Sequence, residues 1–280
     1  MNLLVTTQDL MAHLNDPDWF IFDTRHDLGD TEMGRHVYAE DHIPGSFFLH
    51  MDDDLSGSKN GRNGRHPLPD QRDFAARMAA LGLTRSKHAV VYDDAGGMMA
   101  SRLWWMLRWL GMERVMTLDG GYPKWLREGR PVTAQVPVPI PARNDFVLEA
   151  GMTVDAAFVL SQLGDSASVV LDARSPERYL GEQEPLDPVA GHIPGAVNRP
   201  FKSNLNADGT FRPAGPLRAE YLELLQDRAP SQMVHQCGSG ITACHNLFAM
   251  ELVGLKGSRL YPGSWSEWVA DRSRPVVLAA

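Results

Sequence analysis

Residues 233–242 read MVHQCGSGIT, a short apolar run followed by a cysteine in a glycine-containing turn. A helix-like segment, residues 243–252, comes next, so the stretch predicts a strand, a tight turn and a helix. A cysteine in such a turn meets successive backbone N–H groups and the positive end of a helix dipole, and both favour the nucleophilic thiolate. We therefore interpret the turn as an anion-binding loop with Cys237 as its nucleophile.

The same pattern occurs earlier in the chain. The sequence His-Ile-Pro-Gly stands at residues 42–45 and again at 192–195. Three further matches keep the same order: 23–25 with 172–174, 90–94 with 234–237, and 119–125 with 262–268. Ordered self-similarity of this kind indicates a tandem duplication. In the first copy Asp94 matches Cys237, and because a carboxylate cannot accept a sulfur atom, that copy is expected to be catalytically silent.

A proline-rich connector separates the two copies. Residues 131–141 contain four prolines, which favour an extended, semi-rigid segment and place the domain boundary near residue 140. The predicted domains are 1–140, with most of the connector, and 141–280, with Cys237. In the first copy the pattern predicts strands at 19–23, 89–93 and 114–118, and helices at 70–81, 98–110 and 122–128. This alternation predicts an α/β fold, each domain a parallel sheet covered by helices on both faces.

Composition narrows the classes of partner and location. The 280 residues carry a formal net charge of −8, which argues against nucleic acid or an anionic membrane as the main partner. The N-terminus lacks the pattern of a signal peptide, no apolar run has the length of a membrane span, and we expect a cytoplasmic protein. Two cysteines cannot build a disulfide scaffold, and no His/Cys set has zinc-ligand spacing, so neither a metal nor another cofactor is expected.

Together these motifs resemble the rhodanese sulfurtransferase family over nearly the whole chain. The resemblance implies two tandem rhodanese-like domains, a silent N-terminal one and a catalytic C-terminal one. The loop 237–242 is similar to the Cys-Gly-Ser-Gly-Val-Thr loop of family members that use 3-mercaptopyruvate, whereas thiosulfate-specific members usually have Cys-Arg-Lys-Gly-Val-Thr. It implies that Cys237 takes sulfur from 3-mercaptopyruvate as a persulfide and releases pyruvate. A thiol acceptor, such as a thioredoxin-like protein, or cyanide then removes the sulfur; thiosulfate is the alternative donor.

The expected site surrounds Cys237. The hydroxyls of Ser239 and Thr242 are expected to assist catalysis by donating hydrogen bonds to the outer sulfur or to the departing enolate. Cys244, about two helical turns further on, is expected to be a structural residue of the helix. The substrate-binding residues expected in the loop, through their backbone N–H groups, are Gly238, Gly240 and Ile241.

The donor's carboxylate requires cations from outside the loop. Arg178 matches the substrate-binding arginine of the family, and a planar guanidinium binds a carboxylate in a bidentate manner. Mercaptopyruvate enzymes often carry a second arginine before the second His-Ile-Pro-Gly, where this chain has Leu186. Residues of the first copy are therefore candidates to replace it: Arg102, His66 and the basic loop 59–65.

Two rival interpretations are weaker. Phosphatases with a similar loop need an arginine six positions after the cysteine, and this chain has Ala243 there. A non-catalytic binding module is the remoter alternative, against which the retained cysteine argues. Features shared with the silent copy, namely Arg25 with Arg174 and His42 with His192, are expected to be architectural.

Overall fold

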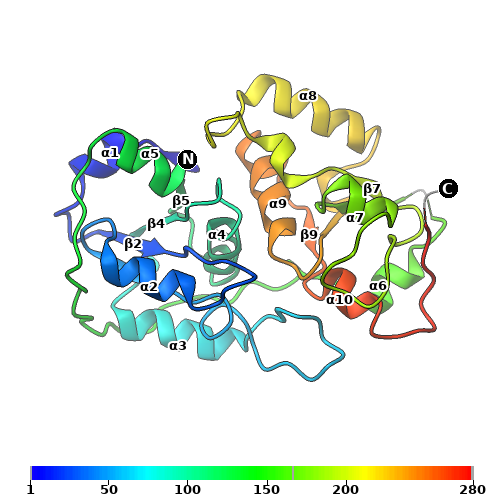
Figure 1. Cartoon of the computed structure of the whole chain (residues 1–280), viewed down its shortest axis with the longest axis horizontal. Helices are drawn as coiled ribbons and strands as arrows, with labels where there is room; N and C mark the ends of the chain where they lie inside the picture. The colour runs from blue at the N-terminus through cyan, green and yellow to red at the C-terminus, as the bar shows by residue number, and fades with distance from the viewer. Residues whose placement is uncertain (1, 166, 279–280) are drawn as a thin grey trace. The chain divides into compact units, whose positions relative to one another are not determined.

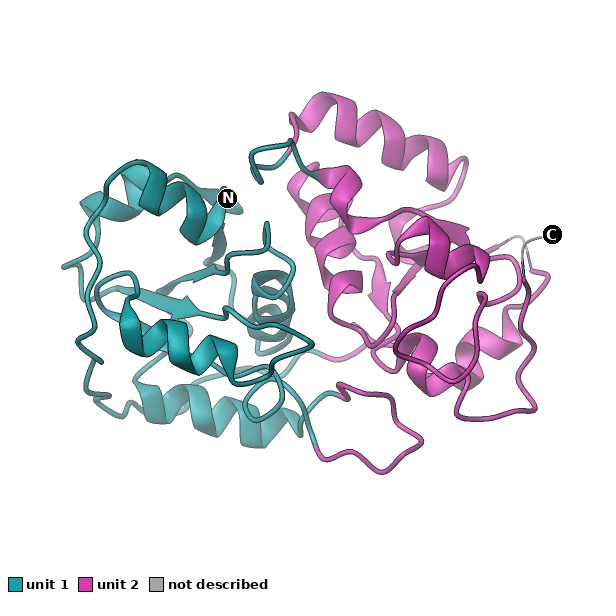
Figure 2. Ribbon diagram, viewed as in Figure 1, with its two compact units in different colours: residues 1–57, 68–149, 205–211 teal, residues 58–67, 150–204, 212–280 magenta. Residues whose placement is uncertain are grey.

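The computed structural model describes residues 2–165 and 167–278 of the chain. The chain forms two compact units (Figure 2). The first contains residues 1–57, 68–149 and 205–211, and the second contains residues 58–67, 150–204 and 212–280. Two short segments are thus exchanged: residues 58–67, from the first half of the sequence, pack with the second unit, and residues 205–211 pack with the first.

The first unit is built on a five-stranded parallel sheet with the strand order β1-β5-β4-β2-β3 (Figure 1). The strands are β1 Leu4–Val5, β2 Trp19–Asp23, β3 Ser46–Phe48, β4 His88–Tyr92 and β5 Val115–Leu118. The strands predicted at 19–23, 89–93 and 114–118 are confirmed to within one residue. Parallel neighbours require crossover connections, which the intervening helices supply.

Helices cover both faces of this sheet. They are α1 Thr7–Ala12, α2 Met33–Glu40, α3 Gln71–Leu81, α4 Ala100–Trp109 and α5 Gly121–Arg127. In Figure 1, α1 and α5 lie together on one side of the strands, and α2 and α3 lie on the other. Leu10 of α1 and Trp125 of α5 pack with Val90 of β4 in one apolar cluster. The three helices predicted in this copy are confirmed, with ends that shift by one or two residues.

The second unit repeats this plan with a four-stranded parallel sheet, in the order β7-β6-β8-β9. The strands are β6 Val169–Asp172, β7 Val197–Asn198, β8 Met233–Gln236 and β9 Arg259–Leu260. The central pair β6–β8 has the same parallel arrangement as the pair β2–β4. The duplication and the α/β fold class predicted from sequence are therefore confirmed.

The helices of the second unit also cover two faces of their sheet. They are α6 Ala156–Ser161, α7 Pro176–Leu180, α8 Ala214–Leu225, α9 Thr242–Leu252 and α10 Ser264–Trp268, with 3-10 turns η1 Phe201–Asn204 and η2 Pro230–Gln232. Trp265 and Trp268 of α10 pack with Val234 of β8 in one buried cluster. Helix α9 contacts α8, and its residues 243–250 are all buried. The beginning of α9 is thereby held rigidly against the sheet.

The motifs shared by the two copies make the same contacts in both. Arg25 pairs with Asp23 (Nη2–Oδ2 2.8 Å), and Arg174 pairs with Asp172 (Nη2–Oδ2 2.7 Å). All four side chains are buried, so each pair ties the end of a strand to the loop that follows it. The same ion pair is thus present in both copies, which agrees with the architectural role expected for Arg25 and Arg174.

The histidines of the His-Ile-Pro-Gly motifs are held in the same way. His42 Nδ1 lies 2.7 Å from the Tyr38 carbonyl oxygen, and His192 Nδ1 lies 2.8 Å from the Tyr179 carbonyl oxygen. Each imidazole also stacks on its tyrosine ring, with 3.9 Å between centroids. Because the same arrangement occurs in both copies, whether or not a cysteine follows the central strand, these contacts agree with an architectural role.

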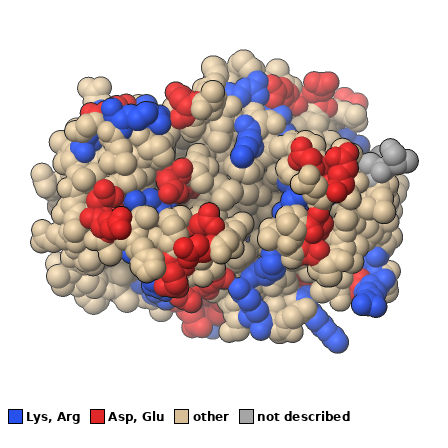
Figure 3. All heavy atoms as spheres, in the orientation of Figure 1, with Lys and Arg blue, Asp and Glu red and all other residues tan. Residues whose placement is uncertain are grey.

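The surface carries charges of both signs. Figure 3 shows Lys and Arg groups interspersed with Asp and Glu groups on the face in view. Within residues 2–165 and 167–278, no helix is long and apolar enough to cross a membrane.

Candidate active site

Cys237 lies in a short loop between β8 and α9, as the sequence predicted. Its side chain is buried, with 2% of the residue exposed, and the Gly240 N–H donates to Cys237 Sγ at 3.1 Å. The sulfur stands before the first turn of an 11-residue helix, whose positive dipole end favours negative charge. The loop is therefore a preformed environment for a thiolate or for the outer sulfur of a persulfide.

The segment that begins with Gly263 holds this loop in place. Ser264 Oγ accepts from the Cys237 N–H at 3.0 Å, and the Trp265 N–H donates to the Cys237 carbonyl at 3.0 Å. The Ser266 N–H donates to the carbonyl of the next loop residue at 2.9 Å. Sequence reasoning used residues 262–268 only as a sign of duplication. These residues position the Cys237 loop through hydrogen bonds between the segment that follows β9 and the loop that follows β8.

In the first copy, the residue equivalent to Cys237 differs from the one that the sequence predicted. Tyr92 pairs with Asp23 on the neighbouring strand just as Gln236 pairs with Asp172. The residue after β4 is Asp93, so Asp93, and not Asp94, stands in the place of Cys237. The prediction was wrong by one residue because the loop after β4 spans residues 93–99, whereas the loop after β8 spans only residues 237–241.

Asp93 fills the corresponding loop of the first copy with its own carboxylate. Its Oδ1 accepts from the N–H groups of Ala95 (2.9 Å) and Gly97 (2.8 Å), and its Oδ2 accepts from those of Met99 (2.7 Å) and Ala100 (2.9 Å). The N–H groups that could receive a substrate anion are thus bonded to the chain itself. The first copy therefore lacks both the nucleophile and an open anion-binding loop.

His66 is brought to the catalytic loop from the exchanged segment 58–67. Its Nδ1 lies 2.8 Å from Ser239 Oγ, and both residues are buried. The sequence placed Ser239 among the catalytic candidates and His66 among the substrate-binding ones, and the structure joins them by a hydrogen bond. Thr242 is the first residue of α9 and is half-buried, while Ile241, before it, is buried.

Arg178 and Arg65 approach the same loop. A Cβ placed on Gly238 would lie 2.9 Å from Arg65 Nη2 and 3.3 Å from Arg178 Nη1. Arg178, on α7, donates to Glu184 (Nη2–Oε1 2.6 Å) and to Asp187 (Nη2–Oδ2 3.3 Å). Arg65 also forms an ion pair with Asp187. The sequence identified Arg178 individually, but Arg65 only as part of a basic loop.

The loop between Glu182 and Gly191 supplies carboxylates to this site. Leu186, where the family often has a second arginine, is exposed, whereas Glu184 and Asp187 have side chains that are 3% exposed. Burial raises the pKa of Asp187, and Glu184 raises it further, while Arg65 and Arg178 oppose the shift. Sequence reasoning missed both acids, because it searched this loop only for a second cation.

Two other residues discussed from the sequence donate to backbone carbonyls. Arg102, on α4 in the first unit, is fully buried and donates to the Leu55 carbonyl (Nη2–O 3.2 Å), so its role in substrate binding stays a prediction. Cys244 donates from its thiol to the Gly240 carbonyl at 3.3 Å, which agrees with a structural role.

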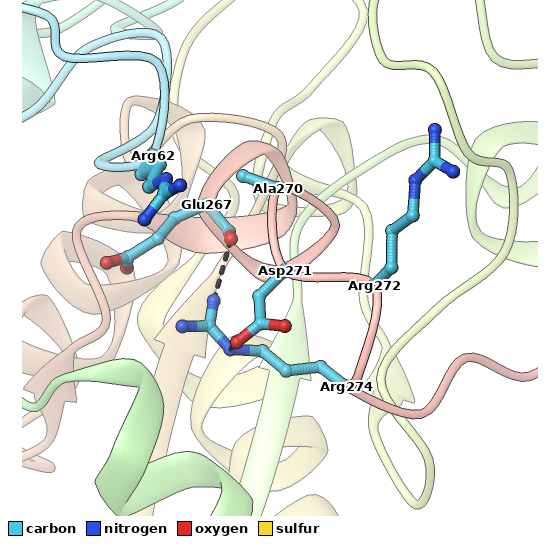
Figure 4. A pocket seen from close by; sticks show the side chains of 6 residues that line it. All are labelled: Arg62, Glu267, Ala270, Asp271, Arg272 and Arg274. Carbon is cyan, nitrogen blue, oxygen red and sulfur yellow. Dashed lines mark hydrogen bonds and ion pairs between the residues drawn. The ribbon is translucent and has the colours of Figure 1, made fainter.

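A pocket of about 430 Å³ lies around α10 and the segment after it. Its lining includes Glu267, Arg274 and Arg62, and Arg62 belongs to the basic loop 59–65 that the sequence offered as a source of the second cation. Figure 4 shows Arg274 bonded to the Glu267 backbone carbonyl (Nη1–O 2.7 Å), while Arg272 points away from this pair. Among the described residues, no group of three or more His, Cys, Asp or Glu side chains is placed to hold a metal ion.

Comparison with known proteins agrees with this geometry. The model of the rhodanese-like domain matches residues 6–128 and again residues 155–271. A Pseudomonas aeruginosa protein named "Probable 3-mercaptopyruvate sulfurtransferase" is 45% identical over 276 residues, covering 98% of this chain and 97% of that protein. Thiosulfate sulfurtransferase of Bos taurus is 35% identical over 247 residues, covering 85% and 80%.

A solved structure is similar over the same length. The 3-mercaptopyruvate sulfurtransferase from Leishmania major superposes with a TM-score of 0.84 at 29% sequence identity, covering 95% of this chain and 74% of that one. Two matched segments, two equivalent sheets and one cysteine loop lead to a single conclusion. The chain belongs to the rhodanese family, with two rhodanese-like domains in tandem.

Proposed function

We propose that this chain is a sulfurtransferase that takes sulfur from 3-mercaptopyruvate and carries it on Cys237. The observation that carries the proposal is the buried sulfur of Cys237, which stands at the beginning of α9 and accepts the Gly240 N–H at 3.1 Å. The names of the Pseudomonas aeruginosa relative and of the Leishmania major structure support this choice of donor.

In the first half-reaction the Cys237 thiolate attacks the donor's sulfur. A sulfur–sulfur bond forms, the donor's carbon–sulfur bond breaks, and its electron pair passes to the enolate of pyruvate. The proton released by the transferred sulfur reaches that enolate, so pyruvate leaves and a persulfide anion remains on the enzyme. The Ser239 hydroxyl, bonded to His66 Nδ1 at 2.8 Å, is suited to move this proton.

The remaining loop residues have roles in the same proposal. The N–H groups of Gly238, Gly240 and Ile241 stabilise the negative charge of the outer sulfur, and the Thr242 hydroxyl donates to the same charge. Arg178 binds the donor's carboxylate. Backbone donors at a helix N-terminus are fixed by the fold, so they need no reorganisation during the reaction.

In the second half-reaction an acceptor thiolate or cyanide attacks the outer sulfur of the persulfide. The sulfur–sulfur bond breaks, and its electron pair returns to Cys237 as the thiolate. We include a thioredoxin-like protein among the acceptors because its thiolate supplies the required nucleophile. In this proposal residues 141–280 form the catalytic domain and residues 1–140 the silent one, except that segment 58–67 packs with the second unit and supplies His66.

Thiosulfate is the second candidate donor. The loop 237–241 has no cation of its own, but the guanidinium groups of Arg65 and Arg178 approach it beside Gly238 and would attract a dianion as well as a carboxylate. The relation to Thiosulfate sulfurtransferase of Bos taurus supports testing it. Turnover with the two donors, compared as kcat/KM, decides between them.

Mass spectrometry tests the central step. After incubation with 3-mercaptopyruvate, a peptide containing Cys237 should carry one additional sulfur atom, and pyruvate should appear in equal amount. The variant Cys237→Ser should show neither product. Absence of added sulfur on the wild-type peptide with either donor, or full turnover in Cys237→Ser, would overturn the proposal.

A further inference from the structure

Two cations flank the side of the catalytic loop at Gly238, the residue after the nucleophile. Arg178 comes from α7, and Arg65 comes from the exchanged segment 58–67. A Cβ on Gly238 would lie 2.9 Å from Arg65 Nη2, and 3.3 and 3.4 Å from Arg178 Nη1 and Nη2. Glycine at this position therefore leaves room for two guanidinium groups, and together they can bind one small anion.

Asp187 already occupies the position between these cations. Its Oδ1 forms an ion pair with Arg65 Nη1, and its Oδ2 lies 3.3 Å from Arg178 Nη2. The two oxygens of one carboxylate thus contact one arginine each. This is the arrangement in which a substrate carboxylate would bind between two guanidinium groups.

The positive and negative charges around Arg65 and Arg178 are equal in number when Asp187 is counted among them. Arg174 pairs with Asp172 and Glu184, and Arg178 pairs with Glu184 and Asp187. With Arg65, three arginines face three carboxylates. A second anion beside Arg178 would leave one negative charge unpaired in a largely buried cluster, unless one carboxylate of the chain moves away.

Asp187 is the carboxylate best placed to move. It lies in a loop without regular structure, and its neighbours Leu186 and Pro188 are exposed. Glu184, by contrast, also accepts from the backbone N–H groups of Leu186 (3.1 Å) and Asp187 (3.2 Å), which anchor it. Burial raises the pKa of Asp187, so its charged form is held less favourably than that of an exposed aspartate.

We infer that Arg65 and Arg178 form a two-arginine site for the donor's carboxylate, and that Asp187 occupies this site as an internal carboxylate until the donor displaces it. The inference rests on the proposed function and extends it, because it assigns the second cation that the loop around Leu186 lacks. It makes Asp187 a competitor that weakens binding of every carboxylate donor, and Arg65 a residue that determines specificity.

Binding of pyruvate and the KM for 3-mercaptopyruvate test the inference. Pyruvate has the donor's carboxylate but no sulfur to transfer, so its Kd, measured by calorimetry, does not depend on turnover. Arg65→Gln should raise both constants by about tenfold or more, since a charge-assisted hydrogen bond is lost. Asp187→Asn should lower both constants by about tenfold, with kcat changed by less than about threefold.

Matched controls come from the same two segments. Arg62→Gln removes an exposed cation from segment 58–67, and Glu182→Gln removes an exposed acid from the loop of Asp187. Both controls should leave KM and the pyruvate Kd within about twofold of wild type. In the double variant Arg65→Gln/Asp187→Asn, the decrease in the pyruvate Kd caused by Asp187→Asn should be smaller than in the wild-type background, because Asp187 then competes only for Arg178.

Several outcomes overturn the inference. Asp187→Asn with an unchanged or higher pyruvate Kd would show that Asp187 only stabilises the loop. If that variant fails to fold, an unchanged pyruvate Kd in Arg65→Gln rejects the two-arginine site by itself. Failure of the wild type to form a persulfide would contradict the proposed function, whereas normal persulfide formation with unaltered Kd values in both variants would contradict only the inference.

Discussion

Replacing Gly240 with alanine tests how tightly the catalytic loop is held. Gly240 has φ +83°, a left-handed conformation that costs an L-residue about 1–2 kcal/mol. The added methyl group would also lie 3.1 Å from the Pro262 carbonyl carbon and 3.2 Å from its Cα, with the carbonyl oxygen closer still. Overpacking of this kind costs about 1–3 kcal/mol. The free energy of unfolding should therefore fall by about 2–5 kcal/mol.

Gly195→Ala provides the matched control in the same unit. Gly195 has φ +77°, but a Cβ there would meet nothing within 4 Å. This variant should lose only the conformational part, about 1–2 kcal/mol. The difference between the two variants, measured by urea titration of each protein, isolates the cost of the contact with Pro262.

The same substitution should slow sulfur transfer. Pro262 precedes the residues whose groups bond to the backbone of Cys237, so a shift of Pro262 moves the nucleophile. A misplacement of about 1 Å costs up to about 100-fold in rate. We expect persulfide formation to slow at least about tenfold in Gly240→Ala and to stay within about twofold of wild type in Gly195→Ala. Equal stability losses and equal rates in the two variants would refute the reasoning.

Three further predictions concern buried groups near the two loops. Asp93→Asn turns one acceptor oxygen into a donor and leaves two of the four bonded N–H groups without a partner. The free energy of unfolding, measured by urea titration, should therefore fall by about 2–5 kcal/mol. The control Asp94→Asn, at an exposed position, should change it little. Burial lowers the pKa of His235 to about 3, so between about pH 6.5 and 3 the unfolded chain binds a proton that the folded chain does not. This residue therefore leaves the free energy of unfolding unchanged above pH 6.5 and lowers it toward pH 3 by up to about 1.4 kcal/mol per pH unit. Urea titrations of His235→Gln should show a pH slope that is smaller by that amount, and an identical slope would contradict the assignment. Cys244→Ala should keep turnover within about threefold of wild type and the persulfide on Cys237, and loss of turnover would instead make Cys244 a redox partner of Cys237.

Local sequence signals predicted the strand, turn and helix around Cys237 because each depends on neighbouring residues. Apolar runs mark buried strands of a parallel sheet, and glycines mark the turn at which Gly240 has a positive φ. The repeated motifs predicted a second copy of the same sheet, which the structure contains. The role proposed for Arg178, on α7, in binding the donor's carboxylate followed from the resemblance to the family, because one arginine in a helix does not by itself indicate a substrate.

The equivalence of Asp94 with Cys237 failed for a reason that sequence alone conceals. The loop after β4 is longer than the loop after β8. Matching the two copies backward from the helices therefore gives Cys237 a different equivalent than matching them forward from the strands. Only the pairing of Tyr92 with Asp23, compared with that of Gln236 with Asp172, identifies Asp93 as the equivalent residue. The strand register is a property of the assembled sheet.

The sequence by itself determined the duplication and the α/β class, and it singled out Cys237 as the proposed nucleophile, because these follow from local periodicity, turn residues and one cysteine in a glycine-containing turn. Only the tertiary structure decided which side chains surround that cysteine. Segment 58–67 packs with the second unit, and it brings His66 to Ser239 and Arg65 to Asp187 across more than a hundred residues of chain. Such contacts depend on which surfaces the fold buries together, and no spacing within either segment encodes them.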